Sequence, residues 1–383
     1  MKVVIPKETA NGERRVAVVP DVVPKLKAAG LEVWVQAGAG LESHHDDSAY
    51  QEAGATVSSD PVELFKDAKA VLKVQPPTLN ELKLIPPNAL LISFLYPGRN
   101  PEIVAGLAIG HVTALALELL PRISRAQTMD ALSSQASLAG YKAVIMGAER
   151  LDKIIPMQMT AAGTLAPARV FVMGAGVAGL QAIATARRLG AIIEAFDVRS
   201  AVKDEIESLG AKFISIPLES AEGSGGYAAE QSEDYLRRQR ELLSERVAAA
   251  DIVITTASVP GRKAPVLVTK EMVSRMRAGS VIIDLASESG GNCEATVPGE
   301  ETVSSGVKIV GVFDVPSSVS VHASQTYSRN VSNFLLALTK GEEFQVDLQD
   351  ELVNASCVTH SGEVRLGFGG AANGTNSSEG NQQ

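Results

Sequence analysis

The most informative chemical pattern in the sequence is a set of three glycines after an apolar run. The segment reads ARVFVMGAGVAGLQAIATARRLGAIIEAFDVRS, with Gly174, Gly176 and Gly179 between a predicted strand and a predicted helix. Gly174 would permit a tight turn, Gly176 the approach of a pyrophosphate to the backbone, and Gly179 close packing of the helix. The free N–H groups of the first helical turn, around Val177, would then face the phosphates. The pattern predicts a dinucleotide-binding turn; the alternative is a glycine-rich turn that binds no nucleotide.

An acidic residue ends the second predicted strand of this segment. Asp197 lies 18 residues after Gly179, where a carboxylate can bind the hydroxyls of an adenosine ribose. A carboxylate also repels a 2′-phosphate, by up to ~4 kcal/mol at about 4 Å for an effective dielectric constant near ~20. We therefore expect NAD(H), with Val198 and Arg199 beside the ribose. Arg199 alone would favour NADP(H); beside the acid it is interpreted as a residue that starts a helix or faces a phosphate, or as a solvated charge.

A second polar cluster precedes a long predicted helix. The segment LLPRISRAQTMDALSSQ places Arg122, Gln127, Asp130 and Ser133 within twelve positions, and Asp130 and Ser133 are three apart, which puts them on one helical face. Such a cluster could hold a carboxamide and a ribose. It could equally be a capping arrangement, with Ser124 as the N-cap and Arg122 paired to Asp130.

Weaker signals lie elsewhere in the second half of the chain. Gly226 and Tyr227 fall in a glycine-rich loop that could close over a ligand, although an ordinary exposed loop tyrosine is the alternative. Thr256 and Ala257 follow a predicted strand, at the edge where α/β folds place ligands. The pattern from Cys357 to His360 has metal-like spacing but no second pair, and its Ser-Gly neighbour predicts a hairpin instead.

The elements that must position these residues alternate along the chain between strands and helices. This alternation predicts an α/β protein with two Rossmann-like parallel-sheet domains joined by long helices. The expected first domain covers 1–125 and is completed by 320–367, a connecting helix covers 126–150, and the nucleotide-binding domain covers 151–319. The expected strands are 2–5, 31–35, 68–74, 89–94, 112–117, 169–173, 192–196, 212–214, 251–255, 280–284 and 308–310, and the expected helices include 21–29, 47–53, 102–108, 125–150 and 320–338.

Composition narrows the function classes. The chain has 383 residues, of which 45% are hydrophobic and 21% charged, so a folded protein of two or three domains is expected. Its net charge of −9 and lack of a basic stripe argue against nucleic-acid binding. Two cysteines favour a reducing compartment. No signal peptide or membrane span is expected, and the Gly, Asn and Ser-rich tail 368–383 is expected to be disordered.

Four segments carry a resemblance to a known family. PKETANGERRVAVVP, ELLPRISRAQTMDALSSQASLAGY, GAGVAGLQAIATARRLGA and IIDLASESGGNCE resemble the NAD(H)-binding first domain of proton-translocating nicotinamide nucleotide transhydrogenases, over roughly residues 1–360. The resemblance implies hydride transfer to NADP+ on a partner subunit, a membrane subunit that carries the protons, a homodimer, and a position on the cytoplasmic face of the membrane. It needs no metal.

The resemblance also assigns roles to individual residues. It places Arg122, Gln127, Asp130 and Ser133 at the nicotinamide. It matches Tyr227 to the tyrosine of a mobile loop that closes on the nucleotide, and Gln239 to a glutamine on the following helix.

Alanine dehydrogenases are related and must be distinguished. Their pattern has a lysine, a histidine and an aspartate that handle an amino or keto acid; here Gln75, Phe94 and Glu288 stand at the expected positions, and only the carboxylate-binding Arg15 is retained. An arginine alone cannot move a proton, so general acid–base catalysis would be missing. The alternatives to a transhydrogenase component are an alanine dehydrogenase-like enzyme and a regulatory protein that binds NAD without turnover.

Overall fold

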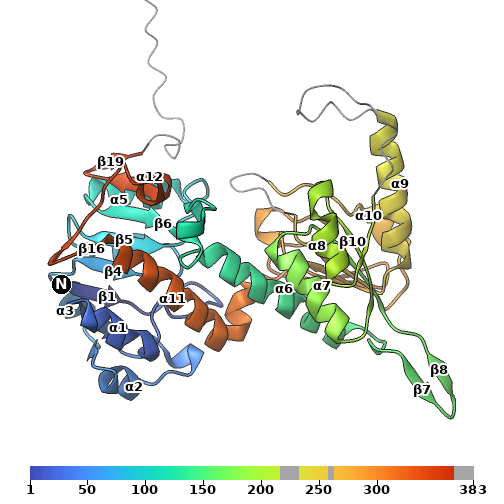
Figure 1. Cartoon of the computed structure of the whole chain (residues 1–383), viewed down its shortest axis with the longest axis horizontal. Coiled ribbons are helices and arrows are strands. Elements are labelled where there is room, and N and C mark those ends of the chain that lie inside the picture. The colour runs from blue at the N-terminus through green and yellow to red at the C-terminus, as the bar shows by residue number, and fades with distance from the viewer. Residues whose placement is uncertain (216–232, 258–262, 366–383) are drawn as a thin grey trace, which may run out of the picture. The chain divides into compact units, whose positions relative to one another are not determined.

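The computed structural model describes residues 1–215, 233–257 and 263–365. The chain divides into two compact units: unit 1 is 1–134 together with the chain from Ser320 onwards, and unit 2 is Gln135–Val319. Each unit has its own largely parallel sheet with helices on both faces (Figure 1). The predicted α/β class with two parallel sheets is confirmed.

Unit 1 is built on an eight-stranded sheet with the order β19-β18-β6-β5-β4-β1-β2-β3. The six strands from β3 to β6 are parallel, and β18 and β19 add an antiparallel edge. Strands β4, β5 and β6 are buried at every residue, as expected for a parallel sheet covered on both faces. The strands are β1 Lys2–Ile5, β2 Glu32–Gln36, β3 Thr56–Ser58, β4 Ala70–Leu72, β5 Leu90–Ser93, β6 Thr113–Ala116, β18 Cys357–His360 and β19 Glu363–Val364.

The helices of unit 1 cover its sheet on both sides. Those of one face, including α1 and α11, pack on Val3 and Ile5 of β1, and those of the other, including α3 and α5, pack on Val4. This split follows from the alternation of side chains along a strand. The helices are α1 Val23–Ala28, α2 Asp47–Glu52, α3 Pro61–Phe65, α4 Leu79–Leu82, α5 Pro101–Ile109, α11 Ser320–Leu338 and α12 Glu351–Ser356, with a small ribbon of β16 Thr339–Lys340 and β17 Glu343–Phe344.

Unit 2 has a seven-stranded sheet with the order β11-β10-β9-β12-β13-β15-β14. All neighbouring strands are parallel except β14, which runs antiparallel to β15 at one edge. Counted along the chain, the parallel strands follow the order third, second, first, fourth, fifth, sixth, which is the order of dinucleotide-binding sheets. The strands are β9 Arg169–Met173, β10 Ile192–Phe196, β11 Lys212–Phe213, β12 Ile252–Thr255, β13 Val281–Asp284, β14 Glu301–Ser304 and β15 Val307–Val310.

Two layers of helices enclose the unit 2 sheet. Helices α6, α7 and α8 pack on Val170 and Val172 of β9, whereas α9 and α10 pack on Phe171 and Met173 of the same strand. Strand β9 is therefore central and buried on both faces, and it ends where the glycine motif begins. The helices are α6 Ala131–Arg150, α7 Val177–Arg188, α8 Lys203–Ser208, α9 Glu233–Ala249 and α10 Lys270–Ser274.

The two long helices differ in how closely they match the expectation. Helix α11 has the predicted bounds, whereas α6 starts at Ala131 rather than near residue 125. The preceding residues Ser124–Ala126 form a separate 3₁₀ turn, and the chain is reset before Asp130. Among the described residues, no helix combines the length and apolar character needed to cross a bilayer.

Several short elements were not expected from the sequence. These include the antiparallel strand β14 and the hairpin of β7 Gln158–Thr160 and β8 Gly163–Leu165, which extends away from the unit 2 sheet (Figure 1). Their side chains lack the buried alternation on which strand prediction depends. The hairpin predicted around Cys357 to His360 is confirmed as β18 and β19, with His360 Nδ1 3.1 Å from Thr113 Oγ1.

An ion cluster is buried beside the unit 1 sheet. The Lys73 side chain is 1% exposed, and its Nζ lies 2.7 Å from Glu81 Oε1 and 3.3 Å from Glu8 Oε2. Burial disfavours the charged ammonium, but the two carboxylates outweigh burial and raise the pKa of Lys73. Glu81 also completes a capping box with Thr78 at the start of α4, so one lysine joins α4 to the sheet.

We expect Lys73→Met to lower the free energy of unfolding by ~3–5 kcal/mol, because it leaves the carboxylates of Glu8 and Glu81 without their cation. Chemical denaturation measures the change. Lys69→Met is the matched control, since Lys69 is exposed at the start of the same strand. Equal stabilities of the two variants would contradict a structural role for the buried cluster.

Candidate functional site

The glycine turn is a close backbone contact at the carboxyl end of β9. Gly174 has a φ of +104°, which strongly favours glycine, and its N–H donates to Phe196 O at 2.8 Å. A Cβ on Gly179 would lie 1.8 Å from the carbonyl oxygen of Gly174. Glycine at both positions therefore lets α7 begin directly against the strand.

The start of α7 presents backbone donors. Gly176 is the N-cap residue and no side chain caps the helix, so the first N–H groups have no partner within the helix. A Cβ built on Gly176 would meet no atom within 4 Å, and Val177, the next residue, is 41% exposed. Open space in front of unpaired helix N–H groups is suited to an anionic ligand such as a phosphate.

Asp197 lies beside this turn at the end of β10. Its side chain is 6% exposed, and its Oδ2 accepts a hydrogen bond from the Ala175 N–H at 2.7 Å. The acid and the glycine turn, separated in sequence, are thus joined directly through the backbone of the turn. Val198, the next residue, is 76% exposed.

Arg199 is paired with Asp197. Its Nε lies 3.0 Å from Oδ1, its Nη2 lies 3.0 Å from Oδ2, and its own N–H donates to Oδ1 at 2.8 Å. Arg199 is also the N-cap residue of the 3₁₀ turn Ser200–Val202, as expected for a residue that starts a helix. The interpretation of Arg199 as a solvated, unpaired charge is wrong. Burial would raise the pKa of Asp197, but the hydrogen bonds from Arg199 and Ala175 outweigh burial and lower it.

The loop after β12 forms another wall of the turn. Thr256 Oγ1 donates to Gly174 O at 3.0 Å. The amide of Asn292, which is fully buried, accepts from the Ala257 N–H at 3.0 Å and donates to the carbonyls of Ala257 and Pro265, each at 2.8 Å. Thr256 and Ala257 are thus held next to the glycine turn, as their place after a strand suggested.

The residues that hold this loop were not singled out from the sequence. Asp284 ends β13, is 1% exposed, and accepts the N–H of Asn292 at 2.8 Å. It also accepts from Thr255 Oγ1 at 3.0 Å and from Thr296 Oγ1 at 2.7 Å. The available signal was an acid directly after an apolar strand, the same pattern that singled out Asp197.

The polar cluster before α6 belongs to unit 1. Asp130 Oδ1 accepts the Ser133 N–H at 2.8 Å, so Asp130 is the N-cap of α6, and the cap at Ser124 and the Arg122–Asp130 pair do not occur. Arg122 and Gln127 are exposed, and Ser133 is partly buried. Within the described ranges of the chain, the side chains of these three residues have no hydrogen-bond partner.

Three assigned residues follow the glycine-rich loop or lie in it. Gly226 and Tyr227 fall outside the described residues. Gln239 lies on α9 and is partly buried.

The positions that distinguish alanine dehydrogenases lie mainly in unit 1. Arg15 is buried and its Nε lies 2.7 Å from Glu13 Oε1, while Gln75 Nε2 donates to Glu13 Oε2 at 2.8 Å. Phe94 is 2% exposed and stacks on Tyr96, and Glu288 is exposed in unit 2. The amide of Gln75 supplies a hydrogen bond here but has no acidic proton for catalysis.

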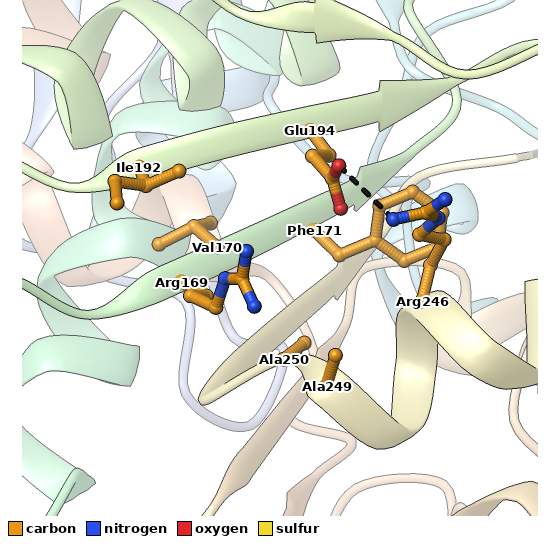
Figure 2. Close-up of a pocket in the computed structure, with 8 residues that line it drawn as sticks. All are labelled: Arg169, Val170, Phe171, Ile192, Glu194, Arg246, Ala249 and Ala250. Carbon is orange, nitrogen blue, oxygen red and sulfur yellow. Dashed lines mark hydrogen bonds and ion pairs between the residues drawn. The ribbon is translucent and has the colours of Figure 1, made fainter.

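A small pocket lies at the opposite end of β9, between β10 and α9. Figure 2 shows Arg246 of α9 reaching Glu194 of β10 above the ring of Phe171, with an Arg246 Nη1–Glu194 Oε1 distance of 3.4 Å. The pocket is at the amino edge of the sheet, where α/β proteins do not place their ligands. Over the described residues, no group of His, Cys, Asp and Glu is arranged to hold a metal ion.

Comparison with known proteins identifies the family. The models "Alanine dehydrogenase/PNT, N-terminal domain" and "Alanine dehydrogenase/PNT, C-terminal domain" match residues 4–139 and 143–366. The chain belongs to the alanine dehydrogenase/PNT family. The resemblance stated from the sequence motifs is thereby confirmed.

Within this family, the transhydrogenase members are more similar than the alanine dehydrogenases. The first of the separate chains that make up the NAD(P) transhydrogenase alpha subunit of Rhodospirillum rubrum is 48% identical, over 95% of this chain and 97% of that protein. The crystal structure of transhydrogenase from Sinorhizobium meliloti has a TM-score of 0.88 at 45% identity, covering 95% of this chain and 100% of that one. An L-alanine dehydrogenase structure has a TM-score of 0.80 at 26% identity, covering 95% and 96%.

The lowered pKa of Asp197 predicts a pH-dependent contribution to stability. A folded-state pKa below the unfolded value of ~3.9 stabilises the fold above that value, and the contribution is lost as the pH falls through the folded pKa. Asp197→Asn should therefore melt below the wild type between about pH 5 and 7, by a margin that shrinks below about pH 4. Thermal melts across this range measure it. Asp204→Asn, an exposed acid on α8, is the control, and a margin independent of pH would contradict the ion pair.

Proposed function

We propose that this chain is the NAD(H)-binding component of a proton-translocating NAD(P)+ transhydrogenase. The observation that carries the proposal is the open glycine turn with the buried carboxylate of Asp197 beside it, at the carboxyl edge of a sheet with the dinucleotide-binding strand order. A dinucleotide fits these features: helix N–H groups for the pyrophosphate and an acid for the adenosine ribose. Similarity to the Rhodospirillum rubrum protein over 95% of the chain supports the choice of reaction.

The proposed reaction is direct hydride transfer from NADH on this chain to NADP+ on a partner subunit. Bound NADH supplies the hydride, and this chain contributes orientation, holding one ring so that the other can approach to about 3–3.5 Å. The transfer needs no proton donor on this chain, which agrees with the presence of an amide at Gln75.

The polar cluster before α6 is proposed to orient the nicotinamide. In this proposal Arg122 fixes the carboxamide or a phosphate, Asp130 and Ser133 hold the nicotinamide end, and Gln127 lies at the junction with the NADP site. The absence of hydrogen-bond partners for Arg122, Gln127 and Ser133 in the described structure supports it, because such side chains are available to a ligand. The residues Gly226, Tyr227 and Gln239 complete the proposed nucleotide contacts.

The assembly belongs to the same proposal. The proton path lies in a separate membrane subunit, NADP binds to another subunit, and this chain lies on the cytoplasmic face of the membrane. We also propose a homodimer. The hairpin of β7 and β8 supports it, since Met159 is 76% and Leu165 49% exposed, and apolar side chains on an extended ribbon favour a protein contact.

Mixing the purified chain with the NADP-binding domain of the partner subunit tests the reaction. With NADH on this chain and a spectrally distinct NADP+ analogue on the partner, we expect an absorbance change that requires both proteins. Without the partner, the chain should bind NADH and show no alanine- or pyruvate-dependent turnover. Amino-acid-dependent turnover would instead identify a dehydrogenase, and NADH binding without transfer to the loaded partner would identify a regulatory protein.

Arg122→Ala tests the orienting cluster. We expect hydride transfer to slow by ~100-fold, because a misplacement near ~1 Å disrupts the reactive geometry, while the melting temperature stays unchanged. Asp130→Asn should also slow transfer without loss of stability, since asparagine caps a helix as well as aspartate does, whereas Asp130→Ala should lose ~0.5–2 kcal/mol of stability.

Arg125→Ala is the matched control for this cluster. Arg125 is exposed three residues after Arg122, and its ion pair is with Asp350. Stopped-flow transfer rates and thermal melts of all four variants separate the two roles. A normal transfer rate in Arg122→Ala would remove Arg122 from the nicotinamide site.

A further inference from the structure

The hydrogen-bonding capacity of Asp197 is already filled without a ligand. An ionised carboxylate has about four acceptor positions. The structure supplies four N–H donors: the backbone N–H groups of Ala175 and Arg199, and Nε and Nη2 of the Arg199 guanidinium. A ribose that donates two hydroxyls to this carboxylate must therefore replace two of these donors.

The four donors differ in how easily they can move. The two backbone N–H groups belong to the glycine turn and to the start of the 3₁₀ turn at Ser200, so they are fixed by the fold. The Arg199 side chain is 54% exposed, whereas that of Asp197 is 6% exposed. The guanidinium therefore covers the solvent side of a buried acid, and it is the donor pair that a ligand can displace.

We propose that Arg199 competes with the adenosine ribose for Asp197 and thereby sets the selectivity between NADH and NADPH. The inference rests on the proposed binding of NAD(H) to unit 2. It assigns Arg199 a role opposite to that of a simple NAD ligand: its side chain leaves the carboxylate when an unphosphorylated ribose binds.

The two nucleotides use the pair differently. A ribose with a free 2′-hydroxyl offers O–H donors that can take the place of the guanidinium N–H groups. A 2′-phosphate offers only acceptors and negative charge, so it requires Arg199 to remain between itself and Asp197 as a shared cation. The arginine thus lowers the affinity for NADH and reduces the rejection of NADPH.

Arg199→Ala should consequently separate the two affinities. Loss of a half-exposed ion pair is expected to tighten NADH binding by about two- to five-fold. Binding of NADPH should weaken by ~10-fold or more, because the 2′-phosphate then faces an unshielded carboxylate. Arg199→Lys keeps the charge but loses the planar two-donor fork, so its selectivity should lie between the two.

The matched control is Arg188→Ala. Arg188 is exposed at the other end of α7 and has no hydrogen bond or ion pair among the described residues, so the variant makes the same charge change away from the ribose. It should leave the ratio of NADH to NADPH affinity unchanged. The adenosine-end ligands AMP and 2′,5′-ADP repeat the comparison without a nicotinamide ring, so the result cannot arise from the cluster before α6.

Calorimetric titration of the full chain with NADH, NADPH, AMP and 2′,5′-ADP tests the proposal. A higher NADH-to-NADPH affinity ratio in Arg199→Ala, with the same change for the fragments and none in Arg188→Ala, is the expected result. Equal weakening of both nucleotides in Arg199→Ala would overturn it, as would an equal gain for both. If the wild-type chain bound neither nucleotide, the proposed function itself would fail, which is a distinct outcome.

Discussion

Unit 2 depends on one close contact between backbone segments. The first turn of α7 touches the carbonyl of Gly174, and a single methyl group on Gly179 would overlap that oxygen. Because the contact fixes where α7 begins, it also fixes the Ala175 N–H that holds Asp197 and the Gly174 carbonyl that holds Thr256. The phosphate-binding donors, the ribose acid and the loop after β12 are therefore positioned by the same turn.

Buried acids at the ends of neighbouring strands extend this arrangement. Asp197 follows β10 and stays partly accessible through a movable arginine, whereas Asp284 ends β13 and is enclosed by donors from its own loop. The same residue type at the same edge thus has two roles that depend on its donors. Where all donors belong to the fold, as for Asp284, the acid holds structure; where some can leave, the acid can bind a ligand.

These differences define what the sequence could predict. Strands β1, β9 and β10 and helix α11 have the predicted bounds because apolar periodicity and glycine stops mark them clearly. The start of α6 was misplaced because Asp130 rather than Ser124 caps it, and both residue types are good caps. The pairing of Arg199 with Asp197 and the clamp at Asn292 depend on distances between loops, which residue spacing does not encode.

Selectivity at the ribose has particular weight for the proposed reaction. A transhydrogenase meets NAD(H) and NADP(H) together, and its two sites must hold different nucleotides for net transfer between the pools. A permanently bare carboxylate would reject the 2′-phosphate strongly, but burial makes an unpaired charge costly in the empty site. Pairing Asp197 with an exposed arginine avoids this cost, since the acid is neutralised without nucleotide and released by a ribose that carries hydroxyl donors. Stability of the empty site and selectivity of the filled one then follow from a single ion pair.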